Sequence, residues 1–192
     1  NGGESEFSAA TDKVDITVTS INDAPVLSTN GGKLTGGSGN AFGTADFALI
    51  DEDDKTSAGD LVSSFLSVLS VTDPDGGNPQ GVAITFADST NGTWQFTTDG
   101  GTNFDTLAPT TPRSRLLDGA DPDHKVRFVP NDNFNGDATI RYRAWDKTAG
   151  TVGQEGDTTN TGGTNVFSLG EVTKKITVRP INDEPTQTLR SV

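Results

Sequence analysis

The 192-residue chain contains no cysteine and only one histidine, His124. The lack of cysteine excludes disulfides, a catalytic thiol and a structural zinc finger, because each of these needs that side chain. A single histidine excludes a histidine-rich metal site and argues against a Ser-His-Asp triad. No apolar run approaches the roughly 18–20 residues that a membrane-spanning helix needs. The sequence therefore predicts no membrane insertion.

Basic residues are also scarce. The chain has 14 lysines and arginines against 27 aspartates and glutamates, which gives a formal net charge of -13. Such a field repels phosphate, so nucleic acid and anionic membranes are poor partners. Divalent cations are the natural partners of a carboxylate excess, and many of the acids are clustered. The alternative is that the acidity only keeps a secreted protein soluble.

The chain is rich in glycine, with 23 residues, and in short segments where apolar and polar residues alternate. This alternation is typical of strands with one buried face, and turn pairs such as Asn91-Gly92 separate them. Residues 84–96 read as one hairpin, whereas 59–71 also suit a short helix. The pattern predicts an all-β fold, an antiparallel β-sandwich. The alternating sets are Val14, Ile16 and Val18; Lys174, Ile176 and Val178; Val82, Ile84 and Phe86; Trp94 and Phe96; Val126 and Phe128; and Ile140, Tyr142 and Ala144.

An internal repeat frames the chain. Residues 1–25 and 161–185 align without a gap at an offset of 160, with 11 identities in 25 positions. A fixed period is typical of a tandem array, so we expect a segment cut from a larger protein. The expected parts are residues 1–20 as the last strand of a preceding repeat, 21–27 as a linker, 28–180 as one complete repeat, and 181–192 as a linker with the start of the next repeat.

Five short acidic or amide patterns are candidates for calcium binding. Calcium takes six to eight oxygen ligands from carboxylates, amides and carbonyls of several chain segments. For each pattern alone, the competing interpretation is a turn or capping residue on a solvated loop. The patterns are Asn22-Asp23, Asn182-Asp183, the run from Asp51 to Asp54, the loop from Asp73 to Asn78, and Asp146.

At these positions the chain resembles the cadherin-like tandem repeats of large bacterial RTX-type surface adhesins. Such units end in a strand and an Asn-Asp-x-Pro linker, as at Asn182 to Pro185, and carry an Asp-rich loop like DPDGGN at 73–78. They also have an Ala-x-Asp ending at Asp146, a glutamate like Glu52, and in bacteria a segment like FVPNDNFNG at 128–136. The resemblance implies an Ig/cadherin-like antiparallel β-sandwich with Greek-key topology, enlarged by loops.

The resemblance also implies Ca²⁺ as the cofactor, at two junctions between repeats. We call these the N-terminal and the C-terminal junction. The implied N-terminal ligands are Asn22, Asp23, Asp73, Asp75 and Asp146. The implied C-terminal ligands are Glu52, the adjoining Asp53, Asn182 and Asp183.

The implied function is a calcium-rigidified extender, or spacer, of a long cell-surface or secreted adhesin. Its partners would be neighbouring repeats of the same polypeptide, with carbohydrate or other cell-surface ligands as further candidates, and its location would be extracellular. Catalysis is not expected, because paired acids such as Asp121 and Asp123 share one loop beside a proline.

Two other functions stay open at this point. The first is a calcium-dependent carbohydrate-binding module that stacks sugars on Trp94, Phe104, Tyr142 and Trp145. The position of both tryptophans in alternating strands favours a core role instead. The second is a subunit of an extracellular filament or matrix, in which residues 13–19 complete the sheet of a neighbour.

Overall fold

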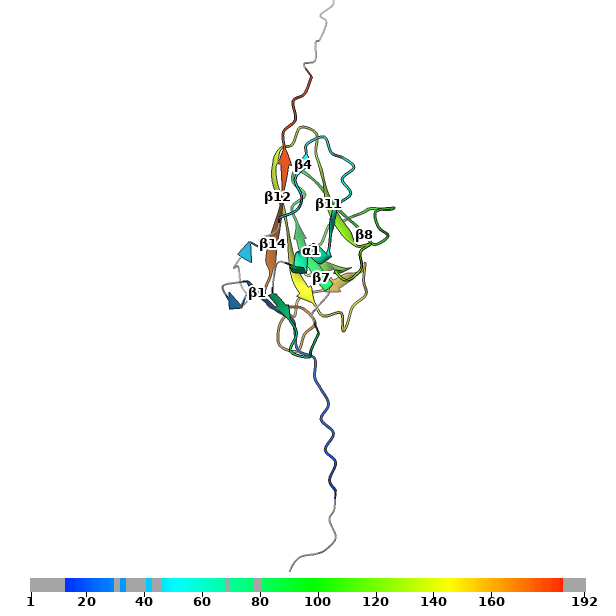
Figure 1. Ribbon diagram of the computed structural model, residues 1–192, viewed down its shortest axis with the longest axis vertical. Coiled ribbons are helices and arrows are strands. Elements are labelled where there is room, and N and C mark those ends of the chain that lie inside the picture. Colours follow the sequence, from blue (N-terminus) through cyan, green and yellow to red (C-terminus); the bar gives the residue numbers. More distant parts are fainter. Residues whose placement is uncertain are drawn as a thin grey trace, which may run out of the picture.

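The computed structural model describes residues 13–29, 32–33, 41–42, 46–67, 70–77 and 81–184. Strands form nearly all of the regular structure, and the one helix in these ranges is α1 (Ser63–Ser67). The strands form antiparallel sheets packed on a common core (Figure 1), which confirms the all-β prediction. The Greek-key connection stays a prediction. No helix of the described ranges is long and apolar enough to cross a membrane.

The largest sheet has seven strands. Neighbouring strands in this sheet are antiparallel, except that β3 and β4 both run parallel to β14. Along the sheet the order is β13 (Glu155–Asp157), β10 (Arg113–Asp118), β7 (Gly81–Ala87), β12 (Gly136–Trp145), β14 (Val172–Arg179) and β3 (Ala41–Phe42), with β4 (Ile50–Asp51) also on β14.

Two smaller sheets complete the fold. One has the order β5 (Asp60–Leu61), β11 (Lys125–Pro130), β8 (Gly92–Thr97) and β9 (Asp105–Thr106). The other has the order β2 (Gly32–Lys33), β1 (Val26–Thr29) and β6 (Ser70–Thr72). Helix α1 lies between β5 and β6, inside the stretch whose apolar spacing also suited a helix.

The predicted hairpin over residues 84–96 is wrong. Strand β7 pairs with β10 and β12, whereas β8 pairs with β11 and β9, so the chain crosses from one sheet to another at this point. Gly92 of the predicted turn instead allows close packing, because a Cβ at this position would overlap the ring of Phe128 in β11. Asn91-Gly92 thus lets β11 approach β8 closely instead of folding β8 back on β7.

The core lies between the facing sheets and contains most of the predicted inward residues. Trp94 packs on Phe128 and on Phe47, with ring centroids 5.0 Å apart in both pairs. Tyr142 is 1% exposed, donates its hydroxyl to the Phe65 carbonyl at 2.6 Å, and has its pKa raised by burial. This confirms the core role of the tryptophan and removes two of the aromatic rings that a sugar-stacking surface would need.

The burial of Lys174 confirms the predicted inward face of β14, although lysine is seldom buried. Lys174 is buried together with Ile176 and Val178, as the alternation required. Its ammonium lies 4.8 Å and 4.7 Å from the ring centroids of Phe47 and Phe65. Burial lowers the pKa of Lys174, and the charges of nearby aspartates oppose this shift. In the other copy of the repeat the same position is Val14, which needs no such surroundings.

Phe86 departs from the predicted alternation. It is 37% exposed, whereas Val82 and Ile84 on the same strand are fully buried. The register between β7 and β12 shifts by one residue here, since Arg141 faces Phe86 while the next residue faces Ile84. A one-residue bulge moves every following side chain to the opposite face of a strand. Phe86 therefore turns outward, and the Arg141 guanidinium lies 4.5 Å from its ring centroid.

A second, smaller core covers the outer face of the largest sheet. Leu116, Trp145 and Phe167 pack there with Ala83, beneath the segment that joins β12 to β14. The Trp145 indole donates to the Ala149 carbonyl at 2.7 Å. Trp145 is only 1% exposed, so it too is unavailable for stacking on sugars. Residues 146–171 thus form a long connection between β12 and β14 that has apolar contacts of its own.

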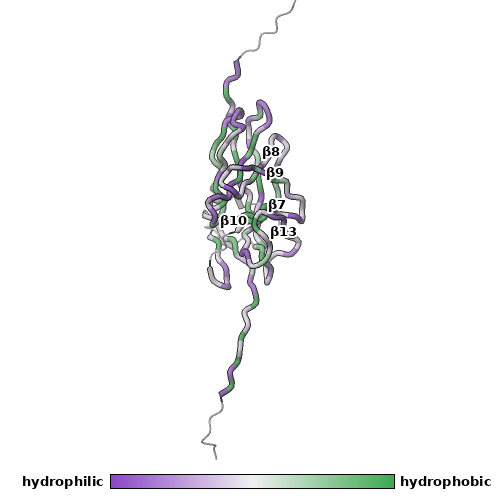
Figure 2. Tube along the Cα trace, turned by 90° about the vertical axis from the view of Figure 1, so that its right-hand side faces the viewer, coloured by the Kyte–Doolittle hydropathy of each residue, from purple (hydrophilic) through white to green (hydrophobic). Residues whose placement is uncertain are grey.

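The two ends of the described chain leave the sandwich at opposite poles (Figure 1), and the view in Figure 2 agrees. At the first pole, residues 13–23 lead into β1, which begins at Val26, inside the range predicted as linker. Ala24 and Pro25 are already buried. At the other pole, the chain leaves after Arg179 of β14. The sandwich therefore lies between the segment that enters it and the segment that leaves it.

The bulge in β7 makes a testable prediction. Ile84→Ala should destabilise the fold by about 2–5 kcal/mol, because it removes a fully buried side chain from the core. Phe86→Ala should cost about 1 kcal/mol or less, because it loses only a half-exposed contact with Arg141. Urea unfolding of both variants measures the difference. Equal losses would place the two residues on one face and refute the bulge.

Candidate functional site

At the N-terminal junction, Asn22 joins the incoming linker to the end of β12. Its Nδ2 donates to Oδ2 of Asp146 at 3.0 Å and to the carbonyl of Asn165 at 3.3 Å. The other oxygen of Asp146 accepts the Thr148 N–H at 2.8 Å and its hydroxyl at 2.7 Å. A carboxylate directly after a rigid strand is thereby held toward the linker.

Asp23 contacts the loop that follows β6. Its backbone N–H donates to Oδ2 of Asp75 at 2.6 Å, while its own carboxylate is exposed. Within that loop, the N–H of Asp75 donates to Oδ1 of Asp73 at 3.0 Å. The glycines that follow both have φ of +91°, a backbone conformation that side chains other than glycine rarely adopt. The DPDGG segment is thus a tight turn in which Asp73 holds Asp75, and the Asp75 carboxylate contacts the linker.

All five residues predicted for the N-terminal junction therefore meet at one pole. They come from three segments that lie far apart in the sequence: the linker, the loop after β6, and the end of β12. Their contacts run in pairs, and within the described ranges no three acidic or histidine side chains gather closely enough to hold a metal as they stand. Four carboxylates and one amide still supply the oxygen ligands that calcium prefers.

These four carboxylates share a feature that sets them apart from several other acids of the sandwich. Among the described residues, none of them forms an ion pair with a lysine, an arginine or the histidine. Elsewhere, Asp118 binds Lys147 at 2.5 Å and Asp137 binds Lys175 at 3.1 Å. The N-terminal pole therefore carries negative charge that no described side chain neutralises.

The linker backbone is also fixed to the unit beside these acids. The N–H of Ala24 donates to the carbonyl of Gly163 at 2.7 Å. Pro25, Pro74 and Leu169 line a cavity of about 220 Å³ beneath this contact. The linker thus reaches the acidic groups along a defined path.

At the C-terminal junction, Glu52 holds the outgoing chain. It is only 4% exposed, and its Oε1 accepts the N–H of Ile181 at 2.7 Å. Its Oε2 accepts from the Asn135 side chain at 3.3 Å, and its own N–H donates to the Arg179 carbonyl at 3.0 Å. Glu52 therefore lies at the exit of the chain, where the sequence placed it.

The other predicted residues of the C-terminal junction do not join Glu52. Asp53, Asn182 and Asp183 are exposed, and in the part of the chain that the structure describes no side-chain hydrogen bond or ion pair joins them to Glu52. The Asn182 amide donates to the Asp183 carbonyl at 3.3 Å, which matches the 3.4 Å contact between Asn22 and Asp23. The two linkers thus share a local conformation, although the Asn-Asp pair meets other acids of the described unit only in the first one.

No family model, curated protein or solved structure matches the chain. Its function therefore has to be argued from the geometry of these two junctions.

Three residues that contact Asp146 or the incoming linker were not predicted from the sequence. Thr148 follows Asp146 by two positions, a spacing at which a hydroxyl and an N–H both reach an aspartate, and the same contacts recur between Thr159 and Asp157. Gly163 belongs to a glycine pair that recurs in the internal repeat, which was a usable signal. Asn165 accepts a hydrogen bond through its backbone carbonyl, a group that every residue has, so its residue type gave no signal.

The two acids of the C-terminal junction should differ in their effect on stability. Glu52→Ala should lower the free energy of unfolding by about 1–3 kcal/mol, because it leaves the N–H of Ile181 without its buried acceptor. Asp53→Ala should change it by about 0.5 kcal/mol or less, since that side chain is exposed. Urea unfolding with a calcium chelator present isolates this structural effect. A loss for Asp53→Ala as large as that for Glu52→Ala would contradict the assignment.

Proposed function

We propose that this chain is a calcium-rigidified extender repeat of a long extracellular adhesin, built as a cadherin-like unit. The observation that carries the proposal is the gathering of unpaired carboxylates around the linker at one pole, while the chain leaves at the other. A spacer needs its two connections at opposite ends. It also needs joints whose bending can be suppressed.

Electrostatics explains why the joint would need a cation. Two like charges 4 Å apart repel each other by about 4 kcal/mol at the effective dielectric constant of a protein surface. Asp73, Asp75 and Asp146 come from two different loops beside the linker, so their repulsion favours an open, flexible joint. A bound Ca²⁺ would neutralise this charge. The residues that would hold it are these three aspartates together with Asn22 and Asp23.

The exposed segment before the linker fits the same proposal. Val14, Ile16 and Val18 are 83%, 83% and 87% exposed, and Figure 2 shows the alternating hydropathy of this tail. At the repeat offset they correspond to Lys174, Ile176 and Val178, whose side chains fill the core. Residues 13–19 would thus be the last strand of a preceding unit, and the linker would join two sandwiches.

At the outgoing pole, the remaining calcium ligands would come from a following unit. Asn182 and Asp183 would meet the acids of that unit in the way that Asn22 and Asp23 meet Asp146 and Asp75 here. Glu52 would add its carboxylate from the present unit, since it already holds the linker at Ile181. Each junction would therefore combine two units and one linker.

Calcium should stabilise the chain against heat. A ligand present at 100 times its dissociation constant adds about 2.7 kcal/mol to the free energy of unfolding, so calcium should raise Tm over that measured with a chelator. Asp146→Asn and Asp75→Asn should each remove most of this increase. Both replacements keep an oxygen acceptor for the Thr148 and Asp23 N–H groups, and Asp146→Asn gives up only the contact with the Asn22 amide, so the chelated variants should melt close to the parent.

Asp105→Asn is the matched control. Asp105 is exposed in β9, away from both junctions, and forms no ion pair with the described residues. Its calcium response in differential scanning calorimetry should equal that of the parent. The proposed site would be refuted if calcium left the Tm of the parent unchanged. It would also be refuted if Asp105→Asn lost as much of the calcium response as Asp75→Asn and Asp146→Asn.

A further inference from the structure

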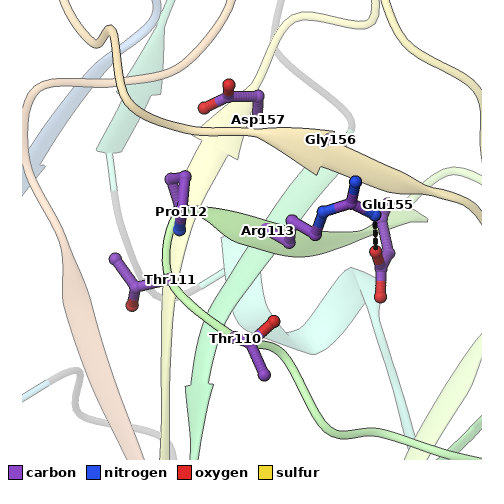
Figure 3. Close-up of a pocket in the computed structure, with 7 residues that line it drawn as sticks. All are labelled: Thr110, Thr111, Pro112, Arg113, Glu155, Gly156 and Asp157. Atoms are coloured by element: carbon purple, nitrogen blue, oxygen red, sulfur yellow. Dashed lines mark hydrogen bonds and ion pairs between the residues drawn. The ribbon is translucent and has the colours of Figure 1, made fainter.

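Two adjoining hollows lie on the largest sheet, away from both junctions. The larger one, of about 450 Å³, is formed where the chain enters β10 and by strand β13 (Figure 3). The smaller one, of about 230 Å³, lies over β7 and β12. Thr111 lines both hollows, so they form one groove. None of the predicted calcium ligands belongs to it.

Arginines converge in the smaller hollow. The Arg141 guanidinium lies 3.3 Å from Oε2 of Glu171, and that of Arg143 lies 3.8 Å from Oε1. Thr85 donates its hydroxyl to the same Oε1 at 2.6 Å. Two positive charges thus face a single carboxylate. On a chain with a net charge of -13, this local positive excess favours an anionic ligand.

Both guanidinium groups are fixed before any ligand arrives. Arg143 donates to the carbonyls of Ser168 and Leu169 at 3.2 Å and 2.5 Å. Arg141 lies over the ring of Phe86, the residue that the bulge turns outward. Positioned guanidinium groups bind carboxylates strongly, because little side-chain entropy remains to be lost. Glu171 occupies the place that the carboxylate of a ligand would take.

The larger hollow has a different chemistry, rich in hydroxyl and carboxylate groups. Figure 3 shows Arg113 in its centre, paired with Glu155 at 2.9 Å, with Asp157 on one side and Thr110 and Thr111 on the other. A hydrogen bond from the Thr159 hydroxyl holds the pKa of Asp157 below its usual value, so this carboxylate is an acceptor at neutral pH. Such a mixture of donors and acceptors matches the hydroxyl groups of a sugar.

We propose that this groove binds an acidic saccharide. A sugar carboxylate contacts Arg141 and Arg143 in place of Glu171, and the hydroxyls of the adjoining sugar contact Glu155, Asp157 and the threonines. A simple anion would use only the smaller hollow. The groove goes beyond the extender function, because it gives the unit a ligand of its own and does not depend on bound calcium.

Titration calorimetry of the full chain with trigalacturonate tests this groove. We expect binding of trigalacturonate and none of the neutral galactotriose, with the same affinity in calcium and in chelator. Glu171→Gln removes the competing carboxylate and should tighten binding about tenfold, whereas Arg141→Gln should weaken it about tenfold, in line with a charged hydrogen bond of 1.4 kcal/mol or more.

Arg179→Gln is the control for overall charge, since Arg179 pairs with Asp51 at the C-terminal pole. It should leave the affinity unchanged. The proposal is overturned if trigalacturonate does not bind, if galactotriose binds equally well, or if binding requires calcium. It is also overturned if Arg179→Gln weakens binding as much as Arg141→Gln, or if Glu171→Gln fails to strengthen it. Failure of this groove would leave the calcium response of the junctions untouched, so the two proposals are tested separately.

Discussion

The arrangement of the molecule depends on one strand, β12. Its ten residues span about 34 Å at the usual rise of an antiparallel strand. Just before it, Asn135 contacts Glu52 at the outgoing pole, and just after it, Asp146 contacts Asn22 at the incoming pole. Alternate side chains of the strand fill the main core, and its last residue, Trp145, fills the second one. The packing of β12 therefore fixes how far apart the two poles lie.

This packing holds β12 firmly within the sandwich. β12 pairs along most of its length with β7 on one side and with β14 on the other. The incoming segment 13–21 has no comparable apolar contact, because its residues are exposed. Under the proposed function, a cation supplies at the joint the cohesion that buried side chains supply within the sandwich.

Much of this structure could be predicted from the sequence. Alternation identified the inward faces of β8, β11, β12 and β14 correctly, because each of these strands has one buried face and no irregularity along its inward set. Phe86 was misplaced because a bulge depends on the neighbouring strand and leaves no mark in the pattern. The hairpin was misplaced because a turn sequence does not specify which sheet the next strand joins. The second core was missed because Leu116, Trp145 and Phe167 come from three distant segments.

The candidate site, like the fold, was predicted only in part. The five residues of the N-terminal junction were found because the repeat marked the linker and short motifs marked the loops, and the fold brings them together. At the C-terminal junction only Glu52 reaches the linker, by a backbone N–H. The ligands still needed there would belong to a following unit. The arginine groove was invisible in the sequence, since Arg141 and Arg143 look like ordinary outward residues of a strand until Glu171 and Thr85 are placed beside them.

The central claim is that calcium fixes the linker to the unit, and a distance measurement between two spin labels tests it most directly. The chain has no cysteine, so Thr19→Cys just before the linker and Ser89→Cys on the sandwich place two labels without interference. Both positions are exposed. Pulsed electron paramagnetic resonance should show one narrow distance distribution with calcium and a broad one with a chelator. Identical distributions in the two conditions would contradict the account.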